Sequence, residues 1–161
     1  MATLVLNIEF PSPSLRERKD SLMAALEARI GILSQQLYDT VQGKLHGGVL
    51  NVGTGALSAS VLLSAVAITG LAVESFVEIP EGSPQHIIGH VHEYGGQGFY
   101  EILPVDAQAL HFIVGGSSVF ARRVNHPPAI ERSFLRSSLD EMTESIFEGL
   151  QETVTAVLGG A

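Results

Sequence analysis

Apolar and polar residues alternate near the N-terminus of the chain. From Thr3 to Phe10 every second residue is apolar, while Asn7 and Glu9 fall between them. A period of two is typical of a half-buried β-strand. The apolar face of this predicted strand consists of Leu4, Leu6, Ile8 and Phe10. Pro11 and Pro13 then end it.

A helical period follows the strand. Ser14 and Glu17 are spaced as a capping box, and Gly47-Gly48 is typical of a helix end, so we expect a helix over Ser14–Leu45. Its apolar residues recur at intervals of one or two turns and form one stripe. The stripe consists of Leu15, Leu22, Leu26, Ile30, Leu33, Leu37, Val41 and Leu45.

The C-terminal segment predicts a second long helix. It begins near Ser138, with Glu141 as the capping partner, and closes at Gly159-Gly160. Its buried stripe is expected to contain Leu139, Met142, Ile146, Leu150, Val154 and Val157.

Shorter apolar runs lie between the two helices. Val61–Ile68 and Leu71–Ile79 flank Thr69-Gly70, which predicts a hairpin. Gln85–Tyr94 predicts a short helix. Further strands are expected over Phe99–Leu103, Leu110–Val114 and Val119–Val124. The sum is an α+β fold, in which an antiparallel sheet is flanked by two long helices. No repeat and no long linker divides the chain, so residues 1–161 are expected to form a single domain.

The uncharged segment from Gly47 to Val73 raises the alternative of a membrane helix. Serine, threonine and glycine residues interrupt its apolar part, Ala56–Val73, so a buried strand pair explains it better. The N-terminus has no basic region ahead of an apolar run, so we expect no signal peptide.

Composition narrows the possible functions. The 161 residues carry a formal net charge of −8, which disfavours a grip on nucleic acid phosphates. The absence of cysteine excludes disulfides and thiolate zinc sites.

The few charges are unevenly distributed. Every charged residue between His46 and Phe120 is acidic, and four arginines follow, at Arg122, Arg123, Arg132 and Arg136. The predicted last helix carries Asp140, Glu141, Glu144, Glu148 and Glu152. These charges form internal contacts or solvated faces, or they join neighbouring subunits head to tail, which favours a ring.

The histidines raise the one alternative in which the protein binds a metal or acts as an enzyme. On a helix, His86 and His90 share a face, which is the spacing of zinc ligands. Ile87, however, stands where a catalytic zinc helix has glutamate, and nothing in the sequence brings His126 near. The other interpretation is that these are surface or interface histidines. The glycine-rich segments match no phosphate-binding loop. We expect no catalytic residue, cofactor or metal.

Three blocks of residues resemble the tail-completion family of siphophages, which includes tail-terminator and minor tail proteins. The first block is Thr54–Ser60 and the second is His92–Gly96. The third runs from Val119 to Leu139. The resemblance extends from about Leu26 to the last helix. Gly53 departs from the family's usual basic residue before Thr-Gly, and Ser133 departs from its usual proline.

The resemblance implies a structural virion protein without enzymatic activity. Such proteins form rings, often hexameric, at the head-proximal end of the tail tube, where they terminate the tail and join it to the head. The implied partners are further copies of the chain, the major tail tube protein and a head-completion or neck protein. DNA passes through the lumen without specific binding, and the implied location is the virion neck, after assembly in the bacterial cytoplasm.

The alternatives are another neck component, such as a head–tail adaptor, stopper or minor tail protein, an unrelated binding module, and a metal-dependent enzyme that uses His86, His90 and His92. For the ring we expect the subunit interface to contain His90, His92, Glu93, Tyr94, Gly95, Arg122, Arg123, Arg132 and Arg136.

Overall fold

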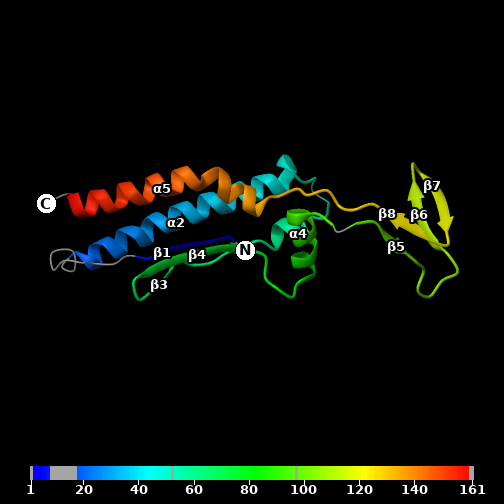
Figure 1. Ribbon diagram of the computed structural model, residues 1–161, viewed down its shortest axis with the longest axis horizontal. Helices are drawn as coiled ribbons and strands as arrows, with labels where there is room; N and C mark the ends of the chain where they lie inside the picture. The colour runs from blue at the N-terminus through cyan, green and yellow to red at the C-terminus, as the bar shows by residue number, and fades with distance from the viewer. Residues whose placement is uncertain (1, 8–17, 52, 97, 160–161) are drawn as a thin grey trace.

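The computed structural model describes residues 2–7, 18–51, 53–96 and 98–159. The chain forms an elongated body with a β-arm projecting from one end (Figure 1). The predicted capping box of Ser14 and Glu17 and the apolar residues Ile8, Phe10 and Leu15 lie outside the described residues.

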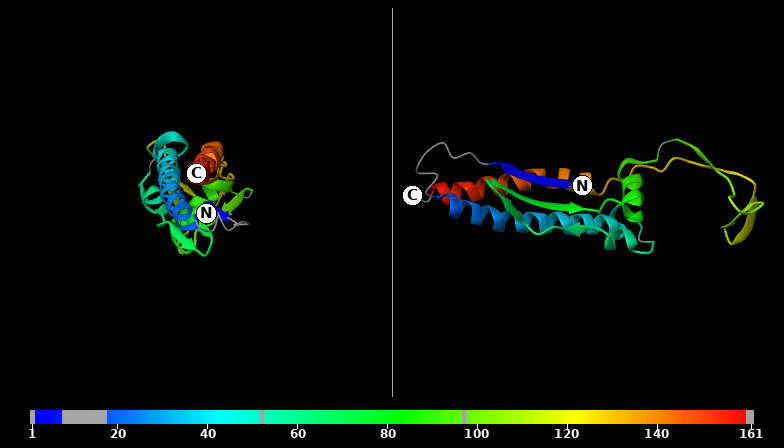
Figure 2. Two further views of the ribbon diagram at one scale, coloured as in Figure 1. Left: turned by 90° about the vertical axis from the view of Figure 1, so that its left-hand side faces the viewer. Right: turned by 90° about the horizontal axis from the view of Figure 1, so that it is seen from below.

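Two long helices run antiparallel along the body (Figures 1 and 2). They are α2, Lys19–Gly43, which continues into the π-helical turn η1, Lys44–Gly48, and α5, Leu135–Gly159. The predicted stripe of α2 is confirmed, since its described members are all buried: Leu22, Leu26, Ile30, Leu33, Leu37, Val41 and Leu45. On α5, Ile146 is buried and the other stripe residues are partly buried against the core.

Both helices pack on one face of a small antiparallel sheet (Figure 2). Its central strand is β4, Ala72–Glu78, with β1, Ala2–Asn7, on one side. On the other side lie two short strands, β2, Leu62–Leu63, and β3, Ala67–Thr69.

The predicted strand Val61–Ile68 is thus interrupted between β2 and β3. At the interruption, the Ser64 hydroxyl oxygen accepts a hydrogen bond from the Phe76 amide at 2.8 Å. The Ser64 amide donates to the Phe76 carbonyl, also at 2.8 Å. The serine side chain therefore occupies a place that a regular ladder gives to a backbone carbonyl. The predicted hairpin turn is present, with Gly70 at φ 66°.

The core lies between the helices and β4. Val73, Ser75 and Val77 alternate along β4 and point toward the helices. One cluster gathers Leu22, Leu26 and Ile30 around Val73, and a second gathers residues from the end of α2 around Val77 and Phe134. Apolar burial contributes about 25 cal/mol per Å², so these clusters dominate the stability of the body.

The predicted start of the last helix was wrong. Helix α5 begins at Leu135, and Ser138 lies inside it, fully buried, with its hydroxyl donating to the Phe134 carbonyl at 2.5 Å. Glu141 is not a capping partner, because its carboxylate binds the Lys44 ammonium at 2.7 Å. The actual cap comes from another element, described below.

Two short helices close the end of the body nearest the arm. They are α3, Ala56–Ala59, and α4, Pro84–Tyr94. The predicted helix at 85–94 is confirmed one residue longer, with the Ser83 hydroxyl accepting from the His86 amide at 3.1 Å as its N-cap. Gly89 is buried against the body, and a Cβ there would lie 2.7 Å from the Ile79 Cδ1.

The remaining strands leave the body and form the arm. Strand β5, Tyr100–Ile102, pairs with β8, Val124–His126, while β6, Leu110–Val114, pairs with β7, Ser117–Ala121. Gly115 and Gly116, both at positive φ, make the two-residue turn between β6 and β7. The α+β class is confirmed, but these strands do not join the sheet beneath the helices (Figure 1).

Replacing Leu26 by Ala should lower the free energy of unfolding by about 2–5 kcal/mol, because it opens a cavity at a fully buried site. Ile32→Ala is the matched control, since this side chain on the same helix is 52% exposed. Equilibrium denaturation in urea measures both variants. Equal stability of the two would contradict the assignment of the stripe to the core.

Candidate functional site

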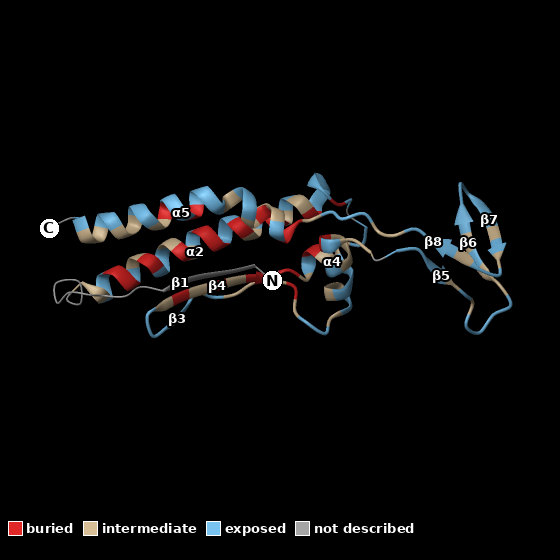
Figure 3. Ribbon diagram, viewed as in Figure 1, coloured by how far each residue is buried: buried red, intermediate tan, exposed pale blue. Residues whose placement is uncertain are grey.

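Many apolar side chains of the arm are exposed, and Figure 3 shows the arm as exposed along most of its length. No described residue from Gly98 to Ile130 is buried. Among its large apolar side chains, the exposed fraction is 93% for Val105, 77% for Phe99, 74% for Ile130 and 70% for Phe120. Other exposed apolar side chains of the arm are Tyr100, Leu103, Ile113 and Val114. Exposed apolar patches of this kind are typical of protein–protein interaction sites.

Two-stranded sheets of this size are at best marginally stable in water. Within the arm, the only ring contacts among the described residues are two stacks across paired strands. The His111 and Phe120 rings are 4.7 Å apart, and the Tyr100 and His126 rings are 4.9 Å apart. The arm therefore has little core of its own, and contact with another protein surface would stabilise it.

Two chain segments join the arm to the body, and backbone hydrogen bonds hold them together. The Gly96 amide donates to the Ala129 carbonyl at 2.9 Å, and the Arg132 amide donates to the His92 carbonyl at 2.7 Å. The segments approach closely, since a Cβ at Gly96 would lie 2.8 Å from the Ala129 nitrogen. This pairing is the base of the arm.

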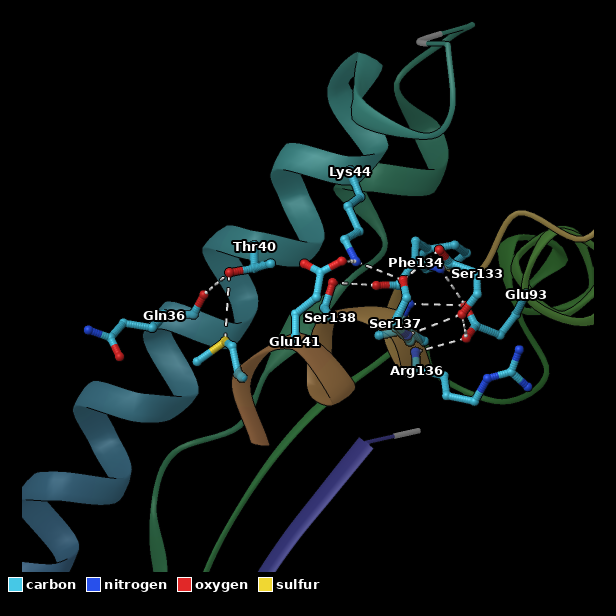
Figure 4. A network of polar contacts seen from close by, with 12 residues as sticks. Gln36, Thr40, Lys44, Glu93, Ser133, Phe134, Arg136, Ser137, Ser138 and Glu141 are labelled. Carbon is cyan, nitrogen blue, oxygen red and sulfur yellow. Dashed lines mark hydrogen bonds and ion pairs between the residues drawn. The ribbon is translucent and has the colours of Figure 1, made fainter. Parts of the chain in front are cut away.

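A buried carboxylate fixes the base of the arm to the body (Figure 4). Glu93, near the end of α4, is only 3% exposed. Its oxygens accept hydrogen bonds from the backbone amides of Phe134 and Leu135, both at 2.9 Å, and of Arg136 at 2.8 Å. The Ser133 hydroxyl donates to the same carboxylate at 2.6 Å. Glu93 thus caps the N-terminus of α5, where the helix dipole favours a negative charge.

Opposing effects act on this carboxyl group. Burial alone would raise the pKa of Glu93, but the hydrogen bonds from Ser133, Phe134, Leu135 and Arg136 together outweigh burial and hold the pKa below its ordinary value. The group is therefore ionised at neutral pH. The network continues to η1 at the end of α2, because the Lys44 ammonium donates to the Ser137 hydroxyl at 2.7 Å (Figure 4).

The expected interface residue Glu93 is consequently not a surface residue. Its side chain is occupied inside the subunit, which the sequence interpretation did not foresee. Its neighbours His90 and Tyr94 are exposed, with ring centroids 4.8 Å apart. The Arg136 guanidinium lies 5.4 Å from the Tyr94 ring centre and also pairs with Glu131. Gly95, at φ 77°, turns the chain out of α4.

The four arginines do not form one patch. Arg122 and Arg123 lie on the arm, where Arg123 pairs with Glu101 at 3.5 Å. Arg132 and Arg136 lie at its base. Sequence proximity suggested a single cluster, but the long excursion of the arm separates the two pairs in space.

The histidines are also separated. His86 and His90 line one hollow of about 160 Å³, as their helical spacing predicted. His92 lines a different hollow beside Arg132, and both burial and the nearby guanidinium lower the pKa of His92. His126 lies on the arm. Among the described residues, no three histidine or carboxylate side chains are placed to hold a metal ion together.

The second hollow brings the three sequence blocks together. It has a volume of about 270 Å³, and its lining includes Thr54–Ser58 from the first block, His92 from the second and Arg132 from the third. Residues far apart in the sequence therefore meet where the arm leaves the body.

Comparisons with protein families, with characterised proteins and with solved structures find no match to this chain. Among the helices that the structure describes, none is long and apolar enough to cross a membrane.

Sequence reasoning missed the apolar arm residues as candidates. Phe99, Ile113 and Phe120 read as ordinary strand residues. One signal was present, since Leu110–Val114 is apolar at four of five positions. Both faces of such a strand carry apolar side chains that are stabilised by burial. The periodicity does not say whether the same chain or another molecule buries them.

Replacing Glu93 by Gln should lower the free energy of unfolding by about 2–3 kcal/mol, since the amide group presents hydrogens to backbone donors. The matched control is Glu144→Gln on the exposed face of α5, which should leave stability nearly unchanged. Thermal and urea denaturation at neutral pH would measure both. A neutral Glu93→Gln result would contradict the capping role.

The Glu93 cap also predicts a pH dependence. Because the folded-state pKa lies below the ordinary value of 4.5, the stabilisation is complete above that value. It is lost as the pH falls from about 4.5 through the lower folded-state pKa. Urea denaturation between pH 3 and pH 7 should show a steeper acid loss for the parent than for Glu93→Gln. Parallel curves would show that this carboxylate does not carry the effect.

Proposed function

We propose that this protein is a structural subunit of a tailed bacteriophage neck, which assembles into a ring on the head-proximal end of the tail tube. The proposal joins the resemblance of the three blocks to one structural observation, the projecting arm with its exposed apolar side chains. A subunit built to assemble needs a surface that is incomplete until a neighbour covers it. The arm has this property.

The division between body and arm supports an assembly role. The body has its own core, whereas the arm has none among its described residues. Contact between an arm and a different surface of the next subunit is heterologous, and such contacts close into a ring when the rotation per subunit divides a full turn. Ring formation thus needs no change in the body.

The charge of the chain fits a passage for DNA. With a net charge of −8, a ring of these subunits would repel phosphate rather than hold it. The proposed partners are the major tail tube protein on one side and a head-completion protein on the other. In this proposal the protein is part of the virion and is assembled in the bacterial cytoplasm.

Replacing residues 99–127 by a short Gly-Ser linker tests the proposal. The Glu93 cap and the pairing of Gly96 with Ala129 remain, so circular dichroism should still show a folded, helical body. By native mass spectrometry, the parent should form rings, either alone or with the tail tube protein of the same phage. The shortened variant should remain monomeric under both conditions.

Electron microscopy of tubes supplies the functional readout. Tube protein polymerised with the parent should give tubes capped at one end, and the shortened variant should give uncapped tubes. If the parent neither oligomerises nor binds tubes, the proposed function fails. If the parent forms rings that do not bind the tube, the protein belongs at another position in the neck.

A further inference from the structure

One face of the β6–β7 hairpin carries a compact set of exposed side chains. In the strand register His111 lies opposite Phe120, and Ile113 lies opposite Ser118. Residues opposite one another point to the same side of a sheet, so Phe120, Ile113 and His111 share a face. Phe120 is 70% exposed and Ile113 is 69% exposed. Arg122 follows directly after the strand, and its guanidinium makes no ion pair within the described residues.

A complementary surface lies on the outer side of α5. Asp140, Glu144, Phe147, Glu148 and Gln151 are spaced as one stripe of a helix, and all are exposed. We call these residues the α5 stripe. Phe147 lies at its centre and is 70% exposed. This large aromatic side chain stands among charged residues and belongs to neither core cluster.

The carboxylates of the α5 stripe differ from the other acidic residues of the helix in their ion pairing. The other acidic residues of the helix are paired, Glu141 with Lys44 and Glu152 with Arg29. Within the described part of the chain, Asp140, Glu144 and Glu148 make no ion pair. They are spaced four residues apart, so they repel one another along the helix. A cation from outside would relieve this repulsion.

The arm cannot reach the α5 stripe of its own subunit. It projects from the end of the body where α4 lies, away from α5 (Figures 1 and 2). A contact between these two surfaces must therefore join two molecules.

We infer that the arm of one copy docks on the α5 stripe of a second copy, with Phe120 beside Phe147 and Arg122 among the stripe carboxylates. The inference rests on the proposed function in one respect, that copies of this chain assemble, and it names the two surfaces that meet. Aromatic and arginine side chains are the residues that most often dominate interface energies. The complementary charges set the register of the contact.

Cysteine cross-linking tests the contact directly, because the chain has no cysteine of its own. One chain carries Phe120→Cys and a second, distinguishable by mass, carries Phe147→Cys. Mild oxidation of the mixture should give about tenfold more mixed dimer than either like dimer, because docking raises the local thiol concentration. The matched control replaces Phe147→Cys by Ile32→Cys, which is exposed on α2 outside the stripe. A majority of 120–120 dimers would instead show arm–arm contact and overturn the inference.

Charge reversal supplies a second test that keeps both phenylalanines. Arg122→Glu should weaken assembly about tenfold, and so should the pair Glu144→Arg with Glu148→Arg. The three changes combined in one chain should restore assembly. Glu81→Arg, an exposed reversal in the loop before α4, is the control and should have no effect. Native mass spectrometry gives the assembled fraction, and circular dichroism checks the fold of each variant.

The outcomes separate this inference from the proposed function. If the parent forms rings while the reversals change nothing and the cysteine pair does not cross-link, the arm docks elsewhere and the ring stands. If the parent remains monomeric both alone and with the tube protein, both proposals fall.

Discussion

The architecture depends on the carboxylate of Glu93. It comes from α4, yet it satisfies the first backbone amides of α5, so one side chain decides both where the long C-terminal helix begins and how α4 sits against the body. Unpaired amides at a buried helix end would be costly, and so would an unpaired buried carboxylate. The hydrogen bonds between the Glu93 carboxylate and these amides remove both costs. The base of the arm lies on the same few residues, so the direction of the arm follows from this cap.

Local patterns predicted much of the body and little of what lies beyond it. The stripe of α2 is periodic over seven turns, and burial of one face explains every described member from Leu22 to Leu45. The start of α5 could not be predicted in this way, because its capping group lies 41 residues earlier than Phe134 in the sequence. The sequence offered a local Ser-Glu spacing at Ser138 as the start signal, but the helix begins at Leu135. Cap recognition from sequence works only when the cap is local.

The candidate site shows the same limit. Strand periodicity predicted strands over Phe99–Leu103, Leu110–Val114 and Val119–Val124, and β5, β6 and β7 overlap these segments, although the third breaks at Arg122 before β8. Nothing in an alternation of side chains says that these strands leave the sheet. The four arginines appeared to form one group, yet Arg122 and Arg132 are separated by the return path of the arm. Glu93 appeared beside exposed histidines and turned out to be buried. The sequence shows which residues are neighbours along the chain. The exposure of a side chain depends instead on which segments of the folded chain pack against it.

The pairing at the base of the arm has a mechanical consequence. Both segments that enter the arm leave the body in the same direction, one from the end of α4 and the other toward the start of α5. A pull on the arm therefore does not slide one segment past the other, and the hydrogen bonds between Gly96 and Ala129 and between Arg132 and His92 are not sheared. The load divides between the two helices, and through Glu93 it passes along α5, one of the two 25-residue helices of the body. A force applied to the arm is therefore carried along helix axes rather than through loops.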